Sequence, residues 1–239
     1  MVALPVIFIG YFMFGVSGFG ASLITVPLLS HVAPPAQLLP MLVVLDFSAA
    51  MALGARFHGA TERSEVAWML PFTIAGAALG VTLLVSLPRT SMMVVIGVFT
   101  LVYAAWQYYE PAGRPRVARG WAPVAGLLCG TMGTLFGAGA APYVMYLTRR
   151  IEDKTVLRAT IATMAVLSTG VRLLAFAASG LMFNREQWIV CALLAPMAAL
   201  GLYAGHRAHL RFSRVQVLRV IFVMLVVSGA SLLVRALAG

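Results

Sequence analysis

A glycine-rich apolar segment occurs twice in the chain, once near the start of each half. The first copy covers residues 18–28 with the sequence GFGASLITVPL, and the second covers residues 137–147 with the sequence GAGAAPYVMYL. The two copies align without a gap at an offset of 119 residues in a chain of 239. Within a membrane, Gly and Pro interruptions at matching places of two halves indicate the binding site of a transporter.

The composition indicates a membrane protein. The chain is 62% hydrophobic and only 10% charged, whereas a soluble domain usually carries about 25% charged residues. Several apolar stretches reach the roughly 20 residues that a helix needs to cross a bilayer. Alternating strand patterns are absent, which argues against an outer-membrane barrel. We therefore predict an all-α polytopic membrane protein.

Eight apolar spans divide evenly between two halves. We predict that residues 1–109 form a first membrane repeat, residues 110–120 a cytoplasmic linker rich in Pro, Gly and Arg, and residues 121–239 a second repeat. The predicted spans cover residues 3–30, 36–55, 66–87, 91–109, 121–147, 156–183, 187–205 and 215–237.

The repeat extends beyond the glycine segments. At an offset of 121 residues, Gly59 and Glu65 match Gly180 and Glu186. At an offset of 125 residues, three Pro and Gly positions of the third span match three in the seventh span. These pairs are Pro71 with Pro196, Gly76 with Gly201, and Gly80 with Gly205.

The basic residues help to decide how the first and fifth spans lie in the membrane. Each span could cross as one long tilted helix or fold back as a re-entrant hairpin. If both cross, the basic residues other than Arg172 divide 7 against 9 and indicate no orientation. If both fold back, 13 lie on one side and 3 on the other, the bias that cytoplasmic loops show. The larger set is Arg56, Arg63, Arg114, Arg116, Arg119, Arg149, Arg150, Lys154, Arg158, Arg207, Arg211, Arg214 and Arg219; the smaller is Arg89, Arg185 and Arg235.

We therefore predict two inverted repeats, each with a glycine-broken re-entrant hairpin followed by three transmembrane helices. Three crossings per half give the halves opposite orientations, as in many secondary transporters. Both termini would face the outside and the linker the cytoplasm. The alternative is eight plain crossings with a parallel repeat.

The glycine segments are the predicted substrate-binding site. A helix that restarts after a break points free N–H groups at whatever lies at its start, and these groups favour an anion. Ser22 suits the N-cap of one such helix, and Pro142 suits the first helical position of the other. The alternative is that small residues only allow close helix packing. The predicted site residues of these segments are Gly18, Gly20, Ala21, Ser22, Gly137, Gly139, Ala140, Ala141, Pro142 and Tyr143.

Two ionisable residues, Asp46 and Arg172, lie well inside predicted spans. Charged groups are costly in a bilayer and usually face a cavity or each other. Arg172 could bind the anion through its planar guanidinium, and Asp46 could carry a coupling proton. Alternatively, the two form a buried pair that only fixes helix positions.

The two glycine segments resemble those of the TauE/SafE family of sulfite exporters, also called TSUP permeases. The first copy, GFGAS followed by Pro27-Leu28, is similar to the family's G-x-G-G-G … P-L stretch. The second, GAGAAP followed by Tyr146-Leu147, is similar to its G-x-G-G-G/P … Y-L stretch. The chain has Ala or Ser at four positions where the family often has Gly, namely Ala21, Ser22, Ala140 and Ala141.

The resemblance implies a permease of the bacterial cytoplasmic (inner) membrane. It would move sulfite, a sulfonate such as sulfoacetate, or a related organosulfur anion, with coupling to the proton gradient. The expected partners are this small anion and the lipid bilayer, with no cofactor and no metal. The sequence allows a homodimer, but no feature of it requires one.

Other functions fit the sequence less well. The net charge of +10 does not indicate nucleic-acid binding, because the basic residues lie between apolar spans. Residues 15–18 match the Gly-x-Ser-Gly string of rhomboid proteases, but all four His residues lie at span ends or in loops, where none can act as the base. A non-transporting scaffold and a passive anion channel are further alternatives.

Overall fold

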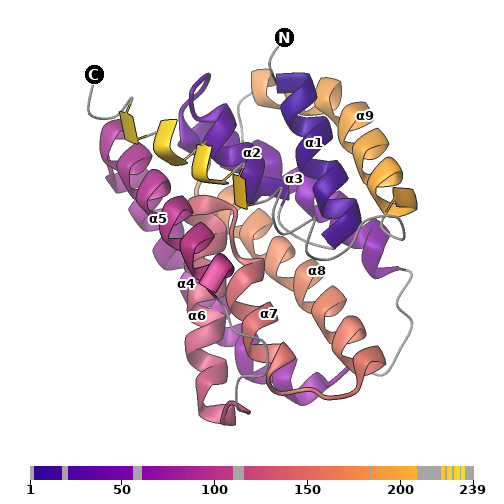
Figure 1. Cartoon of the computed structure of the whole chain (residues 1–239). Coiled ribbons are helices and arrows are strands. Elements are labelled where there is room, and N and C mark those ends of the chain that lie inside the picture. The colour runs from indigo at the N-terminus through magenta and orange to yellow at the C-terminus, as the bar shows by residue number, and fades with distance from the viewer. Residues whose placement is uncertain are drawn as a thin grey trace. The chain divides into compact units, whose positions relative to one another are not determined.

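The computed structural model describes residues 3–17, 21–55, 61–109, 116–182 and 185–208, and short stretches between residues 222 and 234. The elements assigned within these residues are all helical (Figure 1). They are α1 (Ala3–Ser17), α2 (Ala21–Leu29), α3 (Pro35–Gly54), α4 (Arg63–Ser86), α5 (Arg89–Tyr109), η1 (Arg119–Trp121), α6 (Ala122–Phe136), α7 (Ala140–Thr148), α8 (Lys154–Ala178) and α9 (Arg185–Ala208).

The all-α prediction is confirmed, and the helices follow the predicted spans closely. Helices α3, α4, α8 and α9 are long and apolar enough to cross a membrane. Shorter apolar stretches occupy Ala3–Val16 in α1 and Thr90–Ala105 in α5. Most of the predicted last span and residues 110–115 of the predicted linker lie outside the described residues.

The second glycine segment breaks its span into α6 and α7. Helix α6 ends because Gly137 adopts the left-handed conformation, with φ of 70°, which glycine reaches without steric cost. The Gly137 amide donates to the Gly133 carbonyl at 3.0 Å, and the Ala138 amide donates to the Met132 carbonyl at 3.2 Å. These bonds satisfy carbonyls at the end of α6. Helix α7 then starts after its N-cap, Gly139.

In both halves, the short helix after the break turns back along the preceding one. A Cβ atom at Gly139 would lie 2.7 Å from the Cys129 carbonyl oxygen, although ten residues of continuous helix would span about 15 Å. In the first half, a Cβ atom at Gly10 would lie 3.3 Å from the Ala21 carbonyl oxygen. The turn between α1 and α2 itself, residues 18–20, lies outside the described residues.

The chain forms two compact units, each of which combines segments from both halves of the sequence. Unit 1 contains α1, α2, the start of α3 up to Leu42, α5 and α9. Unit 2 contains the rest of α3 from Val43, together with α4, α6, α7 and α8.

In unit 1, glycines bring the backbones of α1 and α9 into direct contact. A Cβ atom at Gly201 would lie 2.5 Å from the Phe8 carbonyl oxygen, and one at Gly205 would collide with the backbone of Phe12. Gly15 of α1 meets the Leu202 carbonyl oxygen in the same way, at 2.5 Å. Small residues at such positions allow the close approach that stabilises helix pairs in membranes.

Unit 2 contains a corresponding contact between α4 and α6. Cβ atoms at Gly76 and Gly130 would collide with the backbone of the facing helix. The Thr131 hydroxyl of α6 also donates to the Gly76 carbonyl at 3.1 Å. Gly76 and Gly201 are matched by the repeat at an offset of 125 residues. In each unit, therefore, the helix that forms the third span of one half packs against the first helix of the other half.

Candidate functional site

The break between α6 and α7 lies directly beside Arg172 of α8. A Cβ atom at Gly133 would lie 2.9 Å from Cδ of Arg172 and 3.2 Å from Cα of Gly139. The Arg172 side chain therefore crosses the end of α6 next to the N-cap of α7. Any side chain at Gly133 or Gly139 would occupy this space, so the small residues allow the guanidinium to approach the break.

Arg172 is paired with Asp46 of α3. Nη2 of Arg172 lies 3.7 Å from Oδ2 of Asp46, and only 4% and 6% of the two side chains are exposed. Both residues belong to unit 2. The structure thus brings together the two ionisable residues that the sequence placed inside spans, on the helices α3 and α8 that correspond in the two repeats.

Buried polar side chains surround this pair. Tyr143 of α7 is 2% exposed, and Cys129 of α6 is fully buried. Arg172 and the hydroxyl residues Ser168 and Thr73 lie in the surroundings of the Cys129 thiol. One charged pair and several small polar groups therefore face one another at the start of α7.

The structure places the other predicted site residues at the helix starts, with two corrections. Pro142 is the third residue of α7 and not the first; it is tolerated there because the first-turn amides lack partners within the helix. Ser22 is the second residue of α2 and not its N-cap. Ala140 and Ala141 open α7, Gly137 caps α6, and Ala21 opens α2. Gly18 and Gly20 lie outside the described residues.

These residues divide between the two units. Ala21 and Ser22 lie in unit 1, where each is 1% exposed. The residues from Gly137 to Tyr143 lie in unit 2, together with Asp46 and Arg172. The group assembled around Arg172 thus comes from unit 2 alone.

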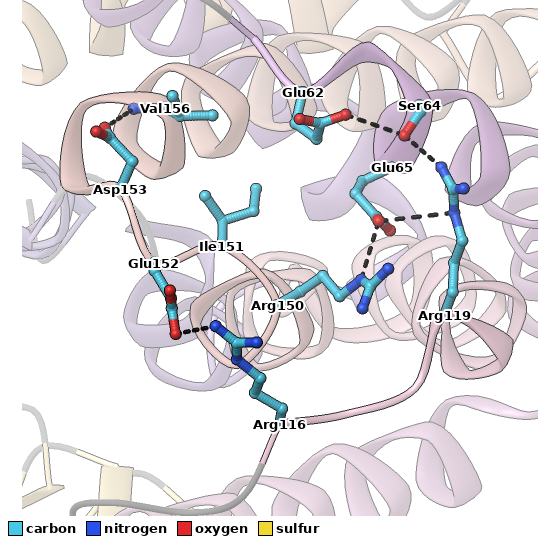
Figure 2. Close-up of a pocket in the computed structure, with 10 residues that line it drawn as sticks. All are labelled: Glu62, Ser64, Glu65, Arg116, Arg119, Arg150, Ile151, Glu152, Asp153 and Val156. Atoms are coloured by element: carbon cyan, nitrogen blue, oxygen red, sulfur yellow. Dashed lines mark hydrogen bonds and ion pairs between the residues drawn. The ribbon is translucent and has the colours of Figure 1, made fainter.

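The sequence did not predict a charged pocket in unit 2, which lies at the far end of α7 (Figure 2). Its central residue is Glu65 in the first turn of α4, which is 4% exposed. In the sequence, Glu65 stands out only as a match to Glu186 in the repeat. Its partners come about 50 and 80 residues later in the chain, so no local motif marks the cluster.

The Glu65 carboxylate accepts a hydrogen bond from Nε of Arg150 at 3.0 Å. This bond, together with the charge of the carboxylate, raises the pKa of the Arg150 guanidinium. Arg150 therefore stays protonated at any physiological pH.

The sequence model of the family described as sulfite exporter TauE/SafE matches residues 3–232. The chain belongs to the TauE/SafE family. It is also 24% identical over 202 residues to the probable inner membrane transporter protein TsaS of Comamonas testosteroni, covering 80% of this chain and 81% of that protein. No solved structure gives a significant match.

Membership of the TauE/SafE family settles the class of the protein. It is a multi-pass inner-membrane transporter and not an enzyme. The intramembrane protease and the non-transporting scaffold are thereby set aside. Its substrate is a small molecule, in keeping with the family's transport activity.

Proposed function

We propose that this transporter is a proton-coupled carrier of a small sulfur-containing anion, such as sulfite or a sulfonate, and that the anion binds where α7 begins. The observation that carries the proposal is the contact of Arg172 with the glycine break. The family description names sulfite, and sulfite and sulfonates present the oxygens that a guanidinium binds in bidentate fashion.

The positive charge of Arg172 is the main attraction for the anion at this break. The Ala141 amide already donates to the Ala138 carbonyl at 3.3 Å, and Pro142 has no amide hydrogen. Two of the first three positions of α7 therefore offer no free donor. The start of α7 contributes its dipole and the space left by Gly139, and Arg172 contributes the charge.

Asp46 provides a physical route to proton coupling. While it is ionised, its carboxylate competes with the substrate for the Arg172 guanidinium. Protonation of Asp46 would remove this competitor, so that the anion and one proton bind together. The bound pair then carries no added net charge, which reduces the cost of moving it through a low-dielectric environment.

We also propose that the two helix breaks are re-entrant hairpins in an inverted repeat, with halves at residues 1–109 and 121–239. The fold-back of α2 and α7 and the asymmetry of the basic residues support this topology. A cysteine placed near Pro34 should then react with an impermeant thiol reagent from outside, and one near Arg150 from inside. Labelling of both from the same face would support eight plain crossings instead.

Flux in proteoliposomes tests the function. Vesicles are loaded in turn with sulfite, sulfoacetate, taurine, sulfate or acetate, a pH gradient is imposed, and flux is compared with that of Gly139→Leu. We expect saturable flux of one sulfur anion, driven by the gradient and lost in the variant, because the new side chain meets the Cys129 carbonyl. Gly120→Leu is the matched control, since a Cβ atom there meets nothing within 4 Å.

Each contrary result has a definite meaning. Flux without saturation or counterflow would indicate a passive anion channel. Full flux in Gly139→Leu would remove the start of α7 from the substrate path. Saturable flux that does not depend on the pH gradient would support a carrier and contradict its coupling to protons.

A further inference from the structure

The charged pocket of unit 2 is a cavity of about 510 Å³. Its lining side chains come from the start of α4 and the residue before it, from the segment before and within η1, from the loop between α7 and α8, and from the first turn of α8 (Figure 2). The lining residues are Glu62, Ser64, Glu65, Arg116, Arg119, Arg150, Ile151, Glu152, Asp153 and Val156. Three of them belong to the basic set that the positive-inside rule assigns to the cytoplasm.

The buried Glu65 of α4 lines this pocket and contacts residues of η1, of α7 and of the loop after α7. Its carboxylate accepts a hydrogen bond from the Tyr146 hydroxyl of α7 at 2.5 Å and one from Nε of Arg150 at 3.0 Å. Nε of Arg119 in η1 lies 3.6 Å away. Through this one buried side chain, the start of α4 is attached to the end of α7.

The start of α4 is also anchored to α8. The hydroxyls of Thr61 and Thr163 lie 3.1 Å apart, and the Glu62 amide donates to the Thr160 hydroxyl at 3.0 Å. The segment that carries Glu65 is thus fixed from the other side. The bonds from Glu65 are therefore polar links between a fixed segment and α7.

An apolar cluster that includes Tyr146 extends from beside Glu65 toward the start of α7, and we call it the plug. It begins with Val66, next to Glu65, and reaches Cys129, whose carbonyl faces Gly139 at the start of α7. The members of this plug are Val66, Met69, Ala122, Ala125, Cys129, Tyr143, Tyr146, Leu147 and Met164. Three of its residues belong to α7, so a shift of α7 would open it.

We propose that the pocket is the cytoplasmic vestibule of the transport path and that Glu65 is the positioning residue that holds the inner gate closed. The gate is the apolar plug. It opens when α7, which carries three of its residues, moves away from the rest of the plug. This inference rests on the proposed function, because it assumes that the anion passes the start of α7. Release of Tyr146 and Arg150 from Glu65 would free α7 and connect the vestibule to Arg172.

The two native cysteines report on this gate without any substrate. Cys129 lies in the plug, and Cys191 lies in α9 of unit 1; both are buried. Purified protein in proteoliposomes is treated with N-ethylmaleimide, and alkylation of each cysteine is followed by mass spectrometry. In Glu65→Gln we expect alkylation of Cys129 to accelerate about tenfold, since loss of a charge-assisted hydrogen bond shifts an opening equilibrium by that factor. Alkylation of Cys191 should not change.

Two further variants make the test specific. Tyr146→Phe keeps the ring in the plug and removes only the hydroxyl, so it should accelerate Cys129 alkylation in the same direction by a smaller factor. It also serves if Glu65→Gln does not fold. Glu152→Gln changes an exposed carboxylate of the same pocket, paired with Arg116, and should leave both cysteines at their wild-type rates.

The outcomes separate this inference from the proposed function. A Cys129 rate that stays unchanged in both Glu65→Gln and Tyr146→Phe, or that rises together with that of Cys191, overturns the gate even if flux is found. A selective rise at Cys129 supports the gate even if none of the tested anions moves, in which case only the substrate proposal fails.

Discussion

The two helix breaks have the same backbone plan and different chemistry. In each, a short helix folds back beside a glycine of the preceding helix, and glycines bring a helix of the other half into backbone contact. Among the described residues, the polar groups that unit 1 buries are the hydroxyls of Tyr11, Ser22, Thr25, Ser30 and Thr100 and the thiol of Cys191, with no carboxylate or guanidinium. The buried ionisable residues Asp46, Glu65 and Arg172 all belong to unit 2.

This difference shows that the repeat specifies backbone geometry and that individual residues outside the glycine segments specify electrostatics. Two similar breaks can therefore have unequal roles. In our proposals, unit 2 provides the charge for the anion and the gate beside it, whereas unit 1 provides hydroxyls and a packed framework. The following predictions test how far this division holds.

The largest expected effect comes from the Arg172–Asp46 pair. Arg172→Gln or Asp46→Asn leaves an uncompensated buried charge, and we expect either to lower the free energy of unfolding by about 3–5 kcal/mol. The double variant should be less damaging than the sum of the two, because no charge is then left alone. Unfolding in a mixed-micelle titration measures this, and additive losses would show that the residues do not interact.

The same pair should separate binding from stability. Arg172→Lys keeps the charge but loses the planar fork, so it should raise the half-saturation concentration for the anion while preserving most of the stability. An unaltered half-saturation concentration would assign Arg172 to structure alone.

The glycine contacts should be equally sensitive in both units, because the repeat provides them to each. Gly130→Ala and Gly205→Ala each place a Cβ atom against facing backbone, and we expect each to cost about 1–3 kcal/mol. Gly120→Ala, which meets nothing within 4 Å, is the control. A large loss in one unit and none in the other would contradict the shared plan.

A smaller effect is expected at Thr25 in α2. Its hydroxyl is buried and has no hydrogen-bond partner among the residues that the structure describes, so Thr25→Val should leave stability unchanged or raise it by about 1 kcal/mol. If unit 1 is only a framework, the half-saturation concentration should stay the same. A clear rise in it would show that unit 1 also contacts the anion.

The smallest effect is expected at the rim of the pocket. Arg116 and Glu152 form an ion pair whose side chains are 70% and 77% exposed, and Glu152→Gln should change the free energy of unfolding by less than about 1 kcal/mol. Comparison with Glu65→Gln then separates the buried carboxylate from an exposed one in the same pocket. Equal losses of stability in Glu65→Gln and Glu152→Gln would show that the two carboxylates are equally exposed to solvent.

Much of the fold could be predicted from the sequence, because long apolar runs and glycine breaks are local signals. The first seven predicted spans, the break at residues 137–139 and the isolated charges Asp46 and Arg172 lie where their patterns indicated. The first helical residues were harder to place. Pro142 and Ser22 each lie two positions further into their helices than predicted, because first-turn residues share the same freedom from helical hydrogen bonds.

The remaining features depend on contacts between distant parts of the chain. The exchange of α4 and α9 between the halves follows from which glycine faces fit together, and the sequence shows only that such faces exist. Glu65 resembled an ordinary acidic residue in the first turn of a helix. Only the fold brings it to Tyr146 and Arg150, 81 and 85 residues away.

The exchange of helices also sets the order in which the protein can be assembled during synthesis. Helix α1 is made first, but the glycine face of its partner α9 begins only after residue 185. Helix α4 must likewise wait in the bilayer until α6 has been inserted. A half-length chain with one repeat could bury these glycine faces only if the helix of its third span packed against the first helix of a second copy. A single-repeat ancestor would therefore have to work as an intertwined dimer.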